Sequence, residues 1–178
     1  MRKLFIVTTI LAVMAGTAGA GDLSVYGSYW STDELDDTWG AGARVRIGPG
    51  TPAWLEVRGT YFDDVTEDRP LFDVELETIP VDAGIGLSLL DEGDANLYLV
   101  GGGTYFLLDT NRGEVDDEVG WYAGVGGDVA LSEHLSLFAE LLFRDVEATV
   151  EDDDLDRIED PADIDLAGSV VNVGLVFR

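Results

Sequence analysis

The stretch 119–145 most constrains what this chain can fold into, because apolar residues recur in it at every second position. In its first part the apolar set is Val119, Trp121, Ala123, Val125, Val129 and Leu131. After Ser132-Glu133-His134 the alternation resumes with Leu135, Leu137, Ala139, Leu141 and Phe143. A period of two is typical of β-strands. Two such runs joined by a three-residue link predict a β-hairpin.

The two faces of this hairpin differ in charge. One face carries no charged residue, whereas the other carries Asp128, Glu140 and Arg144 among small residues. In a soluble sheet the uncharged face would be the core and the charged face would meet water. In an outer-membrane barrel the uncharged face meets lipid and the mixed face lines the lumen. The hairpin alone is compatible with both arrangements.

The beginning of the chain indicates export. Arg2 and Lys3 precede an apolar run from Leu4 to Met14, and Ala18-Gly19-Ala20 forms a small-x-small cleavage site. This pattern predicts a cleaved signal peptide over 1–20 and one mature domain over 21–178. No Cys is present, and no later run reaches the length of a membrane helix. If the mature chain spans a membrane, it must do so as a closed barrel.

The mature chain is strongly acidic. All 36 Asp and Glu residues follow the leader, no Lys does, and the formal net charge of the whole chain is −26. Such a surface repels nucleic acid and anionic membranes, so we expect no nucleic-acid partner. A solvated acidic exterior is the simpler interpretation, and attraction of divalent cations is the alternative.

Eight runs of strand character follow the leader. They lie at 22–31, 38–48, 52–62, a run ending at 89, 95–108, 119–131, 135–145 and 164–178. Pro80 should weaken a central strand, so we expect a bulge or a strand start there. Both faces of the run 95–108 are apolar around Gly101-Gly102-Gly103, and the sequence leaves its phase open.

The links between these runs alternate strictly in length. Links 49–51, 90–94 and 132–134 are short, whereas 32–37, 63–70, 109–116 and 150–163 are long and acidic. This alternation is typical of an up-and-down barrel with short periplasmic turns and longer external loops. Most aromatic residues lie near the long-loop ends, which predicts an aromatic girdle there. They are Tyr29, Trp30, Trp39, Tyr61, Phe62, Phe72, Tyr105, Phe106, Trp121, Tyr122 and Phe143.

With its leader, eight alternating runs, the segment Gly120-Trp121-Tyr122-Ala123-Gly124-Val125-Gly126 and the ending 171–178, the sequence resembles the small eight-stranded outer-membrane barrels of the OmpA/OmpX type. The last strand of that family usually ends on an aromatic residue, whereas here Phe177 is followed by Arg178. The resemblance implies an all-β fold, an eight-stranded antiparallel up-and-down transmembrane β-barrel. It also implies location in the outer membrane and contact with lipid and lipopolysaccharide.

The predicted phases place a balanced set of charges in the barrel interior: Arg44, Arg46, Arg58 and Arg144 with Glu56, Asp82, Asp128 and Glu140. Buried charges are costly unless they are paired, and eight strands leave an interior that side chains can fill. We therefore expect a structural ion-pair network, with a cross-strand pair between Arg44 and Glu56. The alternative is a gate that exchanges ion-pair partners and passes ions.

The sequence favours no catalytic, cofactor or metal site. Related barrel enzymes use a His near the outer rim, whereas the only His, His134, lies in a short turn at the opposite end. The acidic run 151–156, with Glu159, Asp160, Asp163 and Asp165, lacks the spacing of an EF-hand, although weak binding of Ca²⁺ or Mg²⁺ stays open. We expect a monomeric barrel with a structural or surface-interaction role through acidic loops. The alternatives are a narrow ion or small-solute channel and a soluble lipocalin-like carrier.

Overall fold

The computed structural model describes residues 21–32, 37–48, 52–66, 75–110, 118–150, 162–165 and 167–178. The predicted signal peptide (1–20) and the acidic run 151–156 lie outside these residues. Within the described ranges no helix is long and apolar enough to cross a membrane.

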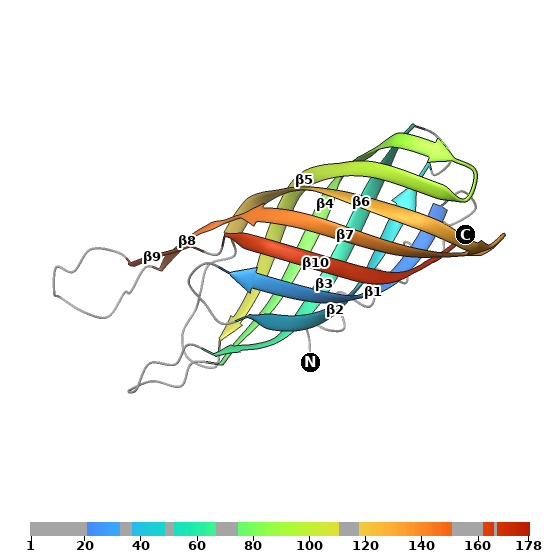
Figure 1. The fold of residues 1–178 in the computed structure, drawn as a ribbon. Helices are drawn as coiled ribbons and strands as arrows, with labels where there is room; N and C mark the ends of the chain where they lie inside the picture. The colour runs from blue at the N-terminus through green and yellow to red at the C-terminus, as the bar shows by residue number, and fades with distance from the viewer. Residues whose placement is uncertain are drawn as a thin grey trace, which may run out of the picture.

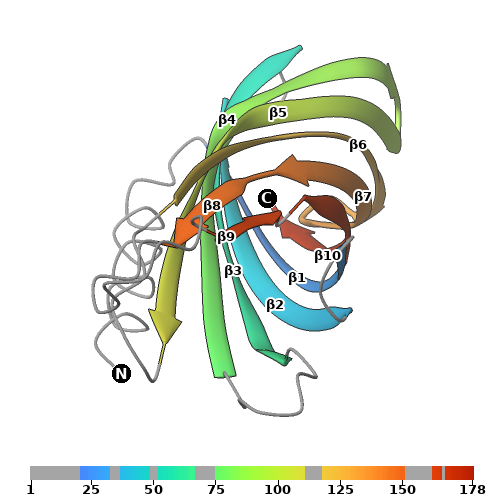
Figure 2. The same ribbon diagram turned by 90° about the vertical axis from the view of Figure 1, so that its left-hand side faces the viewer.

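Eight strands form a closed barrel in which every neighbouring pair is antiparallel (Figures 1 and 2). The barrel strands are β1 (Gly21–Thr32), β2 (Thr38–Ile47), β3 (Ala53–Thr66), β4 (Glu75–Glu92), β5 (Ala95–Thr110), β6 (Glu118–Ser132), β7 (Leu135–Asp145) and β10 (Gly168–Phe177). Each strand pairs with its neighbours in the chain, and β1 pairs with β10 to close the ring. The predicted eight-stranded antiparallel up-and-down barrel is therefore confirmed.

A two-stranded ribbon continues from β7 and β10 beyond the barrel (Figure 1). It consists of β8 (Glu147–Val150) and β9 (Ala162–Asp165), which pair in antiparallel register. The sequence analysis treated 150–163 as an irregular acidic connection and began the last strand at Ile164. Both boundaries differ from the structure because four-residue strands carry too short an alternation to stand out from an acidic background.

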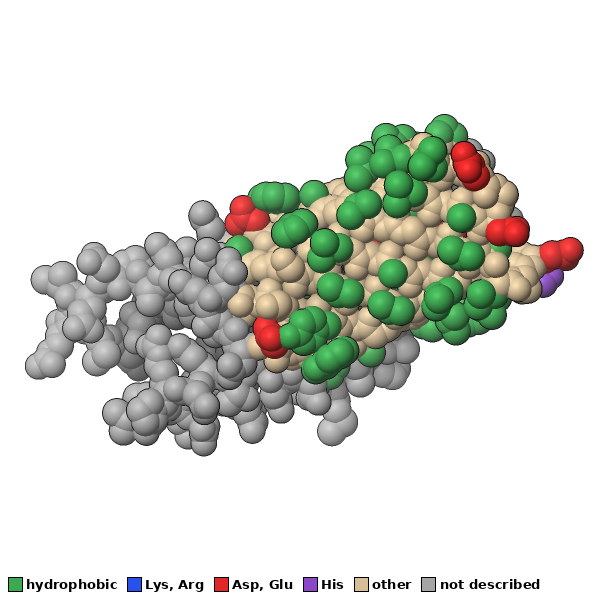
Figure 3. All heavy atoms as spheres, in the orientation of Figure 1, with side chains coloured by type: hydrophobic (Ala, Val, Ile, Leu, Met, Phe, Trp, Pro, Cys, Tyr) green, Lys and Arg blue, Asp and Glu red, His purple; other side chains and the backbone are tan. Residues whose placement is uncertain are grey.

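The outward face of the barrel is apolar. Leu137, Val125 and Val173 are 46%, 40% and 51% exposed, and a band of apolar side chains covers the face shown in Figure 3. Among outward positions whose side chains are described, Val45 and Ile79 are buried, unlike their neighbours. Acidic side chains lie toward the two ends of the band in Figure 3. A water-soluble carrier requires a charged exterior, so this surface contradicts the lipocalin-like alternative.

The sequence leaves open which side chains of β5 face the lumen, and the burial pattern of this strand answers the question. Tyr98, Thr104 and Phe106 are buried inside the barrel, whereas Leu97 and Leu99 are exposed on the outside. Even-numbered residues of β5 therefore face the lumen, and its glycines divide between the two faces.

Two predictions about the β2–β4 region are wrong in detail. Pro80 lies within β4, neither at its start nor at a bulge, and the nearest irregularity is in the facing strand, between Phe62 and Val65. The register of β2 and β3 pairs Arg44 with Arg58 and Arg46 with Glu56. The expected Arg44–Glu56 pair assumed a three-residue turn, whereas the strands end at Ile47 and resume at Ala53. The resulting shift of two residues keeps each side chain on its predicted face.

Candidate functional site: the barrel interior

The described interior has three levels between the short-turn end and the long-loop end. At the short-turn end lies the mouth, formed by Asp22, Arg46, Asp128 and Arg178. The middle holds the ion-pair core, formed by Arg44, Glu56, Arg58, Asp82, Glu140 and Arg144. At the long-loop end lies the aromatic cap, formed by Trp30, Phe62 and Phe106 with Val146 and Val170. Apart from Arg178, all of these residues are buried.

Glu140 of β7 is the centre of the ion-pair core. One carboxylate oxygen accepts from Arg44 Nη1 and from the Tyr98 hydroxyl, the latter at 2.8 Å. The other accepts from Arg58 Nη1 at 2.8 Å. A single buried carboxylate therefore neutralises parts of two guanidinium groups that lie on β2 and β3, which is the arrangement a buried charge requires.

Glu56 supplies the second carboxylate of the core. It accepts from Arg58 Nη2, from the Tyr122 hydroxyl at 3.1 Å and from Trp54 Nε1 at 3.3 Å. The guanidinium of Arg58 also lies 5.3 Å from the centre of the Tyr122 ring, within the range of a cation–π contact. Arg58 is thus held by two carboxylates and an aromatic ring.

The third carboxylate, Asp82 of β4, pairs with Arg144 of β7 in a two-pronged geometry. Arg144 Nη1 and Nη2 lie 3.0 Å and 2.6 Å from the two oxygens of Asp82. Nη1 also donates to the Thr104 hydroxyl at 3.2 Å. Bidentate pairs of this kind are both stronger and more directional than single contacts.

The mouth contains a ring of four alternating charges. Arg46 lies 3.2 Å from Asp22 and 3.5 Å from Asp128, and Arg178 lies 2.7 Å from Asp128 and 3.9 Å from Asp22. Beside this ring is a cavity of about 350 Å³, which Trp54 and Asn96 also line. The polar half of the lumen is therefore hollowed at its short-turn end.

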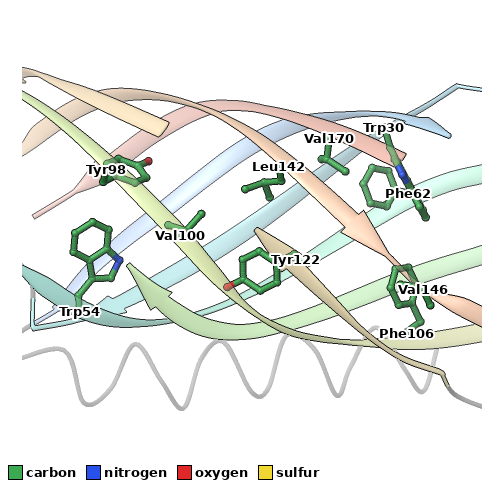
Figure 4. Close-up of a cluster of buried hydrophobic side chains, with 10 residues drawn as sticks. All are labelled: Trp30, Trp54, Phe62, Tyr98, Val100, Phe106, Tyr122, Leu142, Val146 and Val170. Atoms are coloured by element: carbon green, nitrogen blue, oxygen red, sulfur yellow. The ribbon is translucent and has the colours of Figure 1, made fainter. Parts of the chain in front are cut away.

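The aromatic cap closes the other end of the lumen (Figure 4). The ring centres of Trp30 and Phe62 are 5.2 Å apart, and those of Trp30 and Phe106 are 6.0 Å apart. The sequence analysis assigned these three residues, with Tyr122, to a membrane-facing girdle, and this is wrong because all four point inward. Phe72 lies outside the described residues.

The outward aromatic residues fit the predicted girdle. Trp39, Tyr105, Trp121 and Phe143 are exposed near the long-loop ends of their strands. Trp39 packs against Tyr29, with ring centres 4.8 Å apart, and the Tyr29 hydroxyl donates to Asp37. That hydrogen bond lowers the pKa of the exposed Asp37 carboxyl.

All eight charged residues named from the sequence lie in the lumen, and each of them makes at least one of the contacts above with another member of the set. Asp128 and Arg46 belong to the mouth, and the other six form the ion-pair core. The sequence analysis missed Asp22, Arg178 and the two tyrosines Tyr98 and Tyr122. Asp22 shares the parity of Ser24 and Tyr26, and Arg178, the end of the predicted run 164–178, shares that of Asn172 and Val176, so the pattern carried a signal for both.

Among the described residues no cluster of three or more His, Cys, Asp and Glu side chains could hold a metal ion. His134 is exposed in the turn between β6 and β7.

Solved structures with the same fold are outer-membrane proteins. The outer membrane protein OprG from Pseudomonas aeruginosa matches with a TM-score of 0.69 at 16% identity, over 89% of this chain and 95% of that one. Neisserial surface protein A matches with a TM-score of 0.62 at 9% identity, over 88% and 94%. The Escherichia coli outer membrane protein W matches with a TM-score of 0.62 at 13% identity, over 90% and 99%. No protein-family model and no curated protein matches the sequence.

The fold is thus that of the small eight-stranded outer-membrane β-barrels. The uncharged outer face meets the requirement of hydrocarbon, and the closed ring leaves no open sheet edge. In fold and in surface, this chain is similar to integral outer-membrane barrels.

Proposed function

We propose that this protein is a non-enzymatic outer-membrane barrel that holds acidic loops at the cell surface, in a structural or surface-interaction role. The observation that supports this most directly is the filled interior. Between the mouth and the long-loop end, the ion-pair core and the aromatic cap occupy the lumen with buried side chains that contact one another. A barrel filled in this way serves as an anchor.

The charge distribution supports a role for the loops. The three arginines of the core and Arg46 are balanced by interior carboxylates, so the excess negative charge of the chain lies outside the lumen. The acidic segments at the long-loop side would contact lipopolysaccharide through bridging Ca²⁺ or Mg²⁺. In this proposal the signal peptide 1–20 directs export and the mature barrel acts as a monomer.

Planar-bilayer recording of the refolded mature protein tests the filled interior. We expect no stepwise conductance above that of the protein-free bilayer, and regular steps would contradict the proposal. Membrane fractionation supplies the second measurement. The protein should need detergent for extraction and migrate differently on gels before and after heating, whereas release by osmotic shock would contradict an integral barrel.

A narrow channel is the second candidate, and one observation favours it. Glu140 is shared between Arg44 and Arg58, so that either guanidinium could take a new partner if the carboxylate rotated. An ion path would also have to pass the aromatic cap. If conductance steps are observed, Trp30→Ala should increase them and Glu140→Gln should change their size.

The loop role needs its own test. Replacing Glu151, Asp152, Asp153 and Asp154 by their amides removes four charges from one segment. If this segment binds divalent cations, the variant should bind less Ca²⁺ in equilibrium dialysis at fixed ionic strength. Unchanged binding would contradict a role for this loop.

A further inference from the structure

The cavity at the mouth is lined by charged side chains that do not belong to the ion-pair core. Asp22 and Asp128 come from β1 and β6, Arg46 comes from β2, and Arg178 follows β10. The cavity also includes Asp91 and Asp94 at the β4–β5 turn. Four carboxylates against two guanidinium groups give the lining a formal charge of −2, which favours a cationic ligand.

The two buried carboxylates of the mouth are already positioned to receive a cation. Asp128 accepts from Asn96 Nδ2 at 3.3 Å and lies 3.5 Å from Arg46, and Asp22 lies 3.2 Å from Arg46. Because these contacts fix the carboxylates before any ligand binds, little ordering is left to oppose binding. Trp54 adds an aromatic face that already lies 5.5 Å from the guanidinium of Arg46.

The contacts of Arg178 show that these carboxylates bind a guanidinium group. Its guanidinium bridges Asp128 at 2.7 Å and Asp22 at 3.9 Å, yet its side chain is 38% exposed, unlike that of Arg46. Arg46 keeps its own contacts to both carboxylates, so Arg178 can be displaced by a cation that replaces its charge there. An external guanidinium or ammonium group could then take its place.

A second observation concerns Arg46. This side chain is 3% exposed and lines the cavity, and its Nε, like those of the three core arginines, has no hydrogen-bond partner among the described residues. A buried donor without an acceptor is unfavourable. A ligand that presents an oxygen acceptor beside its cationic group would satisfy it.

We propose that the mouth is a binding site for a small organic cation that also carries an oxygen acceptor, the chemistry of a basic amino acid. In this site Asp22 and Asp128 hold the cationic group, Arg46 meets the acceptor, and Arg178 competes with the ligand for the carboxylates. A cavity of about 350 Å³ lies within the usual range for small-molecule sites, roughly 300–1,000 Å³. If the barrel has the proposed orientation, the site opens toward the periplasm.

Calorimetric titration of the full mature protein in detergent micelles tests this inference, with free arginine as the probe. Arg178→Gln should bind arginine about tenfold more tightly than the unmodified protein, since one competing charge-assisted contact is removed. Arg178→Lys, which keeps the competing charge, should bind as the unmodified protein does. Asp128→Asn should weaken binding about tenfold. His134→Gln, at the neighbouring short turn, is the control that should change nothing.

Two further probes separate the parts of the proposal. Ethylguanidinium, which has the same net charge as arginine but no oxygen acceptor, should bind more weakly, and acetate should not bind. Because the acidic loops are identical in all variants, cation binding to the loops cannot produce the expected differences. Absence of saturable binding in both the unmodified protein and Arg178→Gln would overturn the inference. Equal binding by Asp128→Asn, or tighter binding of acetate than of arginine, would also overturn it. If Asp128→Asn folds poorly, the tightening in Arg178→Gln still decides the matter, because loss of folding cannot increase affinity.

Discussion

Arg58 and Glu140 face each other across the full width of the barrel, and Arg58 Nη1 lies 2.8 Å from Glu140 Oε2. They are carried by β3 and β7, which are four positions apart in the ring of eight strands. A contact of this kind joins opposite walls of the lumen, so it resists both widening and shear of the ring. Together with the contact of Arg44 to the same carboxylate, it links the three strands β2, β3 and β7.

Replacing Glu140 by Gln should strongly destabilise the barrel. The substitution leaves Arg44 and Arg58 buried without their shared counter-charge, and breaking one partner of a buried pair costs about 3–5 kcal/mol. The free energy of unfolding in urea, measured in lipid vesicles, checks this. Glu133→Gln, in the exposed β6–β7 turn, makes the same chemical change and should alter stability by less than about 0.5 kcal/mol. Equal effects of the two substitutions would mean that the core is hydrated and not closely paired.

The two tryptophans Trp30 and Trp39 provide a matched test of the aromatic cap. Trp30 is 1% exposed inside the lumen, whereas Trp39 is 71% exposed on the outer rim. Trp30→Ala should cost about 3–5 kcal/mol in unfolding free energy because it opens a cavity against Phe62 and Phe106. In detergent micelles, where no bilayer interface is present, Trp39→Ala should cost clearly less. A larger loss from Trp39→Ala would place the structural aromatic cluster on the outside of the barrel.

Much of this architecture could be predicted from the sequence, because a period of two fixes both the strand and the face of each side chain. Arg44, Glu56 and Glu140 were placed in the lumen by parity alone. Their partners could not be predicted, since parity is unchanged when a strand slips by two residues, as the Arg44–Arg58 register shows. The aromatic cap was missed for a related reason. The distance of Trp30 or Phe62 from its strand end tells how far along the barrel the residue lies. Only its odd or even position in the strand tells whether the ring faces lipid or the lumen.

Glycines on the inner wall leave room for the large side chains of the interior. A Cβ added at Gly86 would lie 2.0 Å from Cε2 of Trp54, whereas one added at Gly27 would meet nothing within 4 Å. Gly86→Ala should therefore displace the Trp54 ring and cost about 1–3 kcal/mol. Gly27→Ala should be tolerated. Unfolding free energies and the fluorescence of Trp54 in a variant that retains only this tryptophan would check the pair. A stable Gly86→Ala variant with unchanged fluorescence would contradict the packing of Trp54 against β4.

Two variants that each place an arginine on the outer face, at different depths, test where the bilayer lies along the strands. Val173 is exposed near the middle of β10, and Leu131 is exposed at the short-turn end of β6. Arg on the lipid face costs about 2–4 kcal/mol at the bilayer midplane and about 0–1 kcal/mol near the interface. Val173→Arg should therefore destabilise the folded barrel in lipid vesicles far more than Leu131→Arg. The difference should shrink in detergent micelles, which present no fixed hydrocarbon slab. Because both substitutions introduce the same side chain on the same outer face, only depth in hydrocarbon predicts that order. Equal costs in vesicles would mean that this face of the barrel does not meet a bilayer.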